Sequence, residues 1–118
     1  MRNYAILLVE DNLVNQRVLD KQLTKAGHSV TLANHGREAL EHLKGTKVWK
    51  GNEDAKDLDV VLMDLEMPVM DGLTATRHIR ELEANGDVRC HVPIIAVTAN
   101  ARKEQIETCL QAGMVYAH

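Results

Sequence analysis

The chain has 118 residues, a length typical of one folded domain. Its 45% hydrophobic and 26% charged residues suit a globular protein and exclude a disordered one. The 14 basic residues are outnumbered by 17 acidic ones, so the chain lacks the positive charge that contacts to nucleic-acid phosphates need. Only 3% of its residues are aromatic, which is too few for stacking on bases. We therefore expect no nucleic-acid partner.

Cysteine usage and hydropathy indicate the compartment. Cys90 and Cys109 form neither a disulfide framework nor a zinc motif, which favours a reducing environment. The longest apolar run, Ala5–Val9, is far shorter than the roughly 20 residues of a membrane span. Glu10 and Asp11 interrupt that run, and no signal-peptide cleavage pattern follows. We expect a cytoplasmic protein without direct membrane insertion.

Strand and helix patterns alternate along the chain. Short apolar or alternating runs predict strands over residues 4–9, 28–33, 59–63 and 93–97. Apolar residues at helical spacing predict four helices. The first begins near residue 12, and the other three cover residues 37–43, 73–83 and 101–112. The charged segment 45–58 has no period and is predicted as a long loop. This order predicts an α/β fold with a parallel sheet covered by helices on both faces.

The first predicted helix has clear end signals. Asp11 or Asn12 can cap its start, and Gly27 is typical of the position just after a helix ends. We expect its apolar stripe to face the sheet. The stripe contains Val14, Val18, Leu19, Leu23 and Ala26.

Polar residues follow three of the predicted strands, at the edge where open α/β sheets bind ligands. Glu10 and Asp11 follow the first strand, Asp64 and Glu66 the third, and Thr98 the fourth. If the first and third strands are neighbours, three carboxylates converge. Two unit charges about 4 Å apart repel by roughly 4 kcal/mol at an effective dielectric near 20, so a cation would stabilise the cluster. Ligands that are all oxygen atoms favour Mg²⁺.

Each of these acids alone has an ordinary structural reading. Asp11 could cap a helix, Glu10 could be a solvated loop residue, and Asp64 could form a turn. Their grouping at the ends of two buried strands favours a site instead. A carboxylate beside Mg²⁺ is a competent nucleophile toward a phosphoryl group. Thr98 could donate to a phosphoryl oxygen or bond locally at the strand end.

Four segments carry a family pattern in the right order and at the right spacing. They are residues 9–12 (VEDN), 61–72 (VLMDLEMPVMDG), 93–99 (PIIAVTA) and 112–114 (AGM). From about residue 5 to residue 114 the chain resembles the response-regulator receiver domain, in particular the C-terminal receivers of hybrid sensor histidine kinases. The resemblance implies a single receiver domain over residues 1–118 with a flavodoxin-like, doubly wound parallel sheet of order 2-1-3-4.

The resemblance also implies a role for each residue of the cluster. Asp64 would be the phosphoacceptor and a metal ligand, and Glu10 and Asp11 would be the acidic pair that holds Mg²⁺. The backbone carbonyl of Glu66 would be a further metal ligand. Thr98 would be the switch hydroxyl that moves onto the phosphoryl group. The donor would be the phosphohistidine of a histidine kinase or a histidine phosphotransfer protein, in two-component signal transduction.

Such a module is expected to transfer a signal and not to turn over a substrate, apart from slow self-dephosphorylation. Pro68 and Gly72 would shape the loop after the third strand. Pro fixes φ and removes a donor, whereas Gly permits close approach or positive φ.

The end of the sequence departs from the family pattern. Family members continue with a fifth strand that ends in Lys-Pro and then a fifth helix, whereas only residues 115–118 follow Gly113-Met114 here. We therefore expect the fifth strand and helix to be missing or atypical, and the Lys contact to the phosphoryl group to be absent. The fourth strand would then be an exposed apolar edge, which favours homodimerisation or element exchange and lowers stability.

Two alternatives from other classes remain open at this point. One is a pseudo-receiver, independent of phosphorylation, whose exposed fourth-strand edge binds a kinase or a second copy. The other is a Mg²⁺ phosphohydrolase with an Asp nucleophile, which needs a general acid two residues further on. Glu66 occupies that position, but Pro68 follows where a substrate-facing loop would be required.

Overall fold

The computed structural model describes residues 3–64 and 71–97, together with the strand 115–117. Its elements in chain order are β1 (Ala5–Val9), α1 (Leu13–Lys25), β2 (Ser29–Ala33), α2 (Gly36–Leu43), β3 (Val60–Asp64), α3 (Gly72–Asn85), β4 (Ile94–Val97) and β5 (Val115–Ala117). The four predicted strands and the first three predicted helices are confirmed. The helix predicted over residues 101–112 lies outside the described residues. None of the helices described is long and apolar enough to cross a bilayer.

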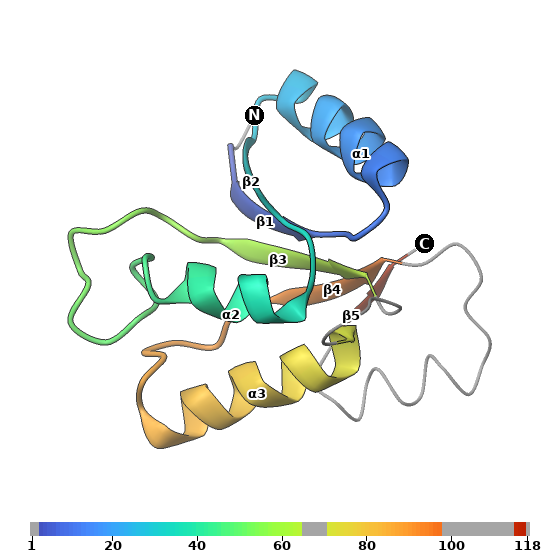
Figure 1. Cartoon of the computed structure of the whole chain (residues 1–118). Helices are drawn as coiled ribbons and strands as arrows, with labels where there is room; N and C mark the ends of the chain where they lie inside the picture. The colour runs from blue at the N-terminus through green and yellow to red at the C-terminus, as the bar shows by residue number, and fades with distance from the viewer. Residues whose placement is uncertain (1–2, 65–70, 98–114, 118) are drawn as a thin grey trace.

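All five strands belong to one parallel sheet of order β2-β1-β3-β4-β5 (Figure 1). The predicted order 2-1-3-4 is confirmed. The fifth strand, which was expected to be missing or atypical, is present as the short strand Val115–Ala117, which pairs with β4 in register, with Val97 opposite Ala117. Three residues are too few for a hydrophobic period, but the open backbone groups of β4 provide pairing partners. The fourth strand is therefore not the edge of the sheet, and the predicted dimerisation through that edge loses its basis.

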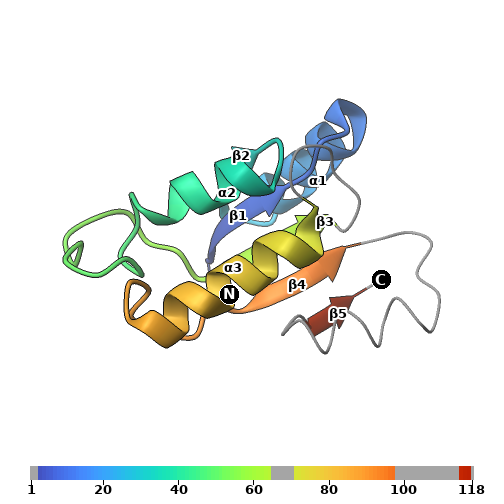
Figure 2. The same cartoon turned by 60° about the horizontal axis from the view of Figure 1, so that its bottom comes forward.

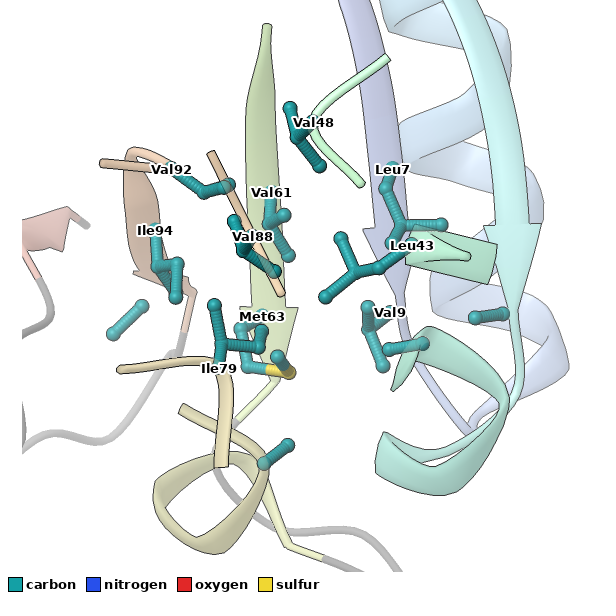
Figure 3. Close-up of a cluster of buried hydrophobic side chains, with 14 residues drawn as sticks. Leu7, Val9, Leu43, Val48, Val61, Met63, Ile79, Val88, Val92 and Ile94 are labelled. Carbon is teal, nitrogen blue, oxygen red and sulfur yellow. The ribbon is translucent and has the colours of Figure 1, made fainter. Parts of the chain in front are cut away.

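The hydrophobic core lies between the sheet and the two helices α2 and α3, while α1 lies on the opposite face (Figures 1 and 2). Side chains alternate across a strand, so every second residue of β1, β3 and β4 faces this core. Figure 3 shows that the buried cluster consists of aliphatic side chains and one methionine. The largest fully buried members are Leu7, Leu43, Met63, Ile79, Ile94, Val9, Val61, Val88 and Val92.

The inward face of α1 differs from the prediction. Val14 and Val18, which we expected against the sheet, are 70% and 49% exposed. Gln16 is the buried residue of this helix instead. The Gln16 side chain makes two hydrogen bonds beside the end of β1. Val14 and Val18 are two positions away from Gln16 and therefore lie on the other side of the helix. Leu19 and Leu23, at helical spacing from Gln16, are half-buried as predicted.

The long segment between α2 and β3 is ordered and pairs with the connection between α3 and β4. Trp49 forms an isolated antiparallel bridge with Val88, and the Arg89 N–H donates to the Val48 carbonyl at 2.7 Å. The Arg89 guanidinium also donates to the Lys47 carbonyl, at 2.9 and 2.6 Å. The segment lies at the amino ends of the strands, on the left of Figure 1. It is therefore remote from the edge that carries the acidic residues.

Val48 anchors this segment, because its side chain is only 5% exposed and belongs to the core cluster. We expect Val48→Ala to lower the free energy of unfolding by about 2 kcal/mol, since the lost methyl groups leave a cavity. Urea denaturation measures this change. Lys50→Ala, at an exposed position two residues further on, should leave the midpoint unchanged. Equal midpoints for both variants would show that the segment does not contribute to the core.

Candidate metal centre at the carboxyl ends of the strands

Three predicted acids converge where β1 and β3 end. The two strands are parallel neighbours with Val9 opposite Met63, so the next residue of each strand, Glu10 and Asp64, lies at the same edge. Asp11 follows directly. One carboxylate oxygen of each acid lies within 4.8 Å of the other two. The structure thus brings together Glu10, Asp11 and Asp64, whereas Glu66, Thr98 and Pro68 lie outside the described residues.

The three acids differ in burial and in how they are held. Glu10 is 7% exposed, whereas Asp11 and Asp64 are half-buried. The Glu10 N–H donates to the Ala33 carbonyl of β2 at 3.0 Å. The Asn12 N–H points at the Glu10 carboxylate, at 3.5 Å. Asp64 and Asp11 are therefore the acids more open to a reactant, while Glu10 is suited to act as a buried ligand.

Asn12, and not Asp11, caps helix α1. The Asn12 Oδ1 accepts hydrogen bonds from the backbone N–H groups of Val14 and Asn15, both at 3.0 Å. Asn12 therefore fills the structural role that could have explained Asp11. The Asp11 carboxylate is left at the acidic cluster.

The first turn of α3 rests directly on the end of β3. A Cβ added at Gly72 would lie far inside van der Waals contact with the backbone oxygen of Asp64, and 3.0 Å from the Met63 Cγ. Gly72 is not among the described glycines with positive φ, so close approach, and not an unusual backbone angle, requires glycine here. Asp71, for which no role was expected, caps α3 with its side chain, which accepts from the Thr74 N–H at 2.7 Å. An Asp just before the helix was the signal that could have identified it.

The donor set fits Mg²⁺. All three donors are carboxylate oxygens, the ligand type that Mg²⁺ prefers, and a magnesium site usually takes one or two carboxylates with several waters. One oxygen of each carboxylate lies within 4.8 Å of the other two, so a single cation placed among them would neighbour all three acids. A divalent cation would also offset the mutual repulsion of the three acids.

The sequence matches a known protein family over nearly its whole length. The sequence profile of the response regulator receiver domain covers residues 6–117, nearly the entire chain. The chain belongs to this family. Receiver domains are signalling modules of two-component signal transduction, and the flavodoxin-like sheet described above is their fold.

The curated relatives of this receiver domain are much longer proteins. It is 42% identical over 109 residues to the hybrid signal transduction histidine kinase I of Dictyostelium discoideum. The aligned region covers 92% of this chain and 6% of that protein. It is also 39% identical over 130 residues to histidine kinase 2 of Arabidopsis thaliana. That aligned region covers 97% of this chain and 10% of the kinase. The chain thus spans a tenth or less of either length.

Solved receiver domains share the fold. The receiver of the histidine kinase CKI1 from Arabidopsis thaliana, complexed with Mg²⁺, superposes with a TM-score of 0.82 at 32% identity, over 97% of this chain and 81% of that one. The receiver of the sensor histidine kinase PA1611 from Pseudomonas aeruginosa has a magnesium ion in its active site cleft. It superposes with a TM-score of 0.75 at 42% identity, over 98% and 84% of the two chains.

A third solved structure contains a receiver together with a partner protein. It is the Saccharomyces cerevisiae histidine phosphotransfer protein Ypd1 in complex with the receiver domain of Ssk1. The TM-score is 0.77 at 30% identity, over 97% of this chain and 77% of that one. Receiver domains of this fold therefore include one that is recognised by a histidine phosphotransfer protein.

Proposed function

We propose that this receiver domain accepts a phosphoryl group on Asp64 from the phosphohistidine of a histidine kinase or histidine phosphotransfer protein. Glu10, Asp11 and Asp64 would hold the Mg²⁺ that the reaction requires, and residues 1–118 would act as one domain. The observation that carries this proposal is the convergence of the three carboxylates within 4.8 Å at the carboxyl ends of β1 and β3. The relatives crystallised with Mg²⁺, and the complex of Ypd1 with a receiver, support it.

The nucleophile of the proposed reaction is the Asp64 carboxylate. An oxygen of Asp64 forms a bond to phosphorus while the bond from phosphorus to the imidazole nitrogen breaks, and the imidazole leaves with the electron pair. An ionised carboxylate attacks without a base that removes a proton from it. Bound Mg²⁺ would supply charge that offsets the phosphoryl oxygens. Asp64 is half-buried and would be accessible to such a donor, and the buried Glu10 beside it would act as a ligand.

Two further roles belong to the proposal, although their residues lie outside the described ranges. The backbone carbonyl of Glu66 would complete the metal ligands, and the Thr98 hydroxyl would bond the phosphoryl group. Phosphorylation replaces the carboxylate charge of Asp64 with roughly −1.5 to −2 units on the phosphoryl group, so the acidic edge gains at most about one further negative charge together with three acceptor oxygens, which is the change that a partner would detect. We place this reaction in the cytoplasm, because two cysteines without a disulfide framework suit a reducing compartment.

The pseudo-receiver alternative receives no support. It relied on an exposed fourth-strand edge, and β5 pairs with that edge. Neither homodimerisation nor kinase binding through β4 has another structural basis among the described residues.

The test is phosphorylation of the purified chain with acetyl phosphate and, separately, with a phosphorylated histidine phosphotransfer protein. With Mg²⁺ present, intact mass should increase by one phosphoryl group. Removal of Mg²⁺ with EDTA should abolish the increase, because the three acids then repel an anionic donor. A folded chain that gains no phosphoryl group from either donor at saturating Mg²⁺ would overturn the proposal.

A further inference from the structure

Gln16 is the one residue of helix α1 that the structure buries, with 7% of its surface exposed. A polar residue at the inward position of an amphipathic helix is unusual, because burial of an amide costs free energy unless its donors are bonded. The proposed phosphoryl transfer does not use this side chain. Its hydrogen bonds therefore indicate what it does.

Both amide hydrogens of Gln16 have acceptors on other elements. The Gln16 Nε2 donates to the backbone carbonyl of Glu10 at 3.0 Å and to the Asn34 Oδ1 at 3.0 Å. Glu10 directly follows β1, and Asn34 directly follows β2. One buried side chain thus joins the ends of two neighbouring strands at the acidic edge of the sheet.

The backbone of Glu10 is consequently held on both sides. Its N–H donates to the Ala33 carbonyl and its carbonyl accepts from Gln16. The N–H belongs to the Val9–Glu10 peptide unit and the carbonyl to the Glu10–Asp11 unit, so the peptide units on both sides of the Glu10 Cα are held. Rotation of the backbone at Glu10 is therefore restricted, which directs the Glu10 and Asp11 side chains. Asn34 is itself held, because its Nδ2 donates to the Glu38 carboxylate at 3.2 and 3.4 Å.

We infer that Gln16 is a positioning residue of the metal centre, which orients the Glu10–Asp11 peptide for Mg²⁺ through its bonds to Glu10 and Asn34. The inference rests on the proposed function, since it concerns the same ion. It assigns to Gln16 no contact with the metal or with the phosphoryl group. An apolar side chain of the same length could fill the space, but it could not donate either hydrogen bond.

The test compares Gln16→Met with Gln22→Met. Both variants change a glutamine of α1 to an apolar side chain of similar length, but Gln22 is exposed. Calorimetric titration of the full chain with MgCl₂ measures the dissociation constant, and thermal unfolding in EDTA measures stability without the ion. We expect about tenfold weaker Mg²⁺ binding for Gln16→Met, the lower end of the range for outer-shell partners of metal ligands. Gln22→Met should bind as the unsubstituted chain does.

Asn34→Ala provides a second variant in case Gln16→Met does not fold. It removes the acceptor that orients the Gln16 amide and leaves the bond to Glu10 possible, so a smaller loss of Mg²⁺ affinity is expected. A purely structural role would lower the unfolding midpoint in EDTA and leave the Mg²⁺ affinity of the folded chain unchanged. Unchanged affinity in the folded variants, with normal binding by the unsubstituted chain, overturns the inference but not the proposed function. An unsubstituted chain that binds no Mg²⁺ and gains no phosphoryl group overturns both.

Discussion

Replacement of Asp64 with Asn is expected to abolish the Mg²⁺-dependent phosphoryl adduct and to leave the fold intact. The amide has the same shape as the carboxylate, but its oxygen is neutral and a poor nucleophile toward phosphorus. The substitution also removes one of three negative charges that lie within 4.8 Å of one another. Without Mg²⁺ the cluster then repels itself less, so the unfolding midpoint in EDTA should not fall. Intact mass after acetyl phosphate treatment, together with thermal unfolding, measures both effects.

Asp54→Asn is the matched control for this experiment. Asp54 is exposed in the segment between α2 and β3, at the amino ends of the strands, so this variant should form the adduct as the unsubstituted chain does. Peptide mapping identifies the modified residue. An adduct of normal yield on the Asp64→Asn chain, mapped to Glu10 or Asp11, would assign the nucleophile to another acid and contradict the role given to Asp64.

Replacement of Gly72 with Ala should destabilise the domain and weaken the metal centre at the same time. The new Cβ would clash with the backbone oxygen of Asp64 and press on the Met63 Cγ at 3.0 Å. Neither contact can be relieved by a flexible side-chain end alone, so the start of α3 or the end of β3 must move. We expect a loss of about 3 kcal/mol in the free energy of unfolding, at the upper end of typical overpacking costs. Because Asp64 ends β3, the displacement should also weaken Mg²⁺ binding.

Gly45→Ala is the control, since a Cβ there meets only the His42 carbonyl, at an ordinary 3.7 Å. Urea denaturation and Mg²⁺ titration of both variants measure the difference. Gly45→Ala should match the unsubstituted chain in both measurements. If Gly72→Ala also matched it, the close packing of α3 on Asp64 would not matter for either stability or ion binding.

The segment between α2 and β3 is held by contacts with residues that are distant in the sequence, and local sequence patterns do not contain such contacts. Residues 45–58 have no hydrophobic period and were predicted as a loop, yet Val48 is buried and Trp49 pairs with Val88. These partners are about forty residues apart in the chain, so no window of adjacent residues contains both. Only the path of α3 back along the sheet brings them together.

The sequence by itself determined the strands and the acids that follow them, and the resemblance to receiver domains implied the strand order 2-1-3-4. Buried strands of a parallel sheet appear as short apolar runs, and their carboxyl ends share one edge. Once the first and third strands are taken as neighbours, Glu10, Asp11 and Asp64 are therefore expected together. The sequence left two candidates for the residue that caps α1, Asp11 and Asn12, because both side chains offer an oxygen acceptor.

The tertiary structure alone decided the fifth strand and the inward face of α1. Val115–Ala117 is too short for a periodic pattern, and it becomes a strand because β4 offers unpaired backbone groups beside it. Val14 and Val18 made the more apolar stripe, but Gln16 is the residue that faces inward, where its amide donates to acceptors on Glu10 and Asn34. These acceptors follow two different strands, so the local hydrophobic pattern of the helix cannot report them.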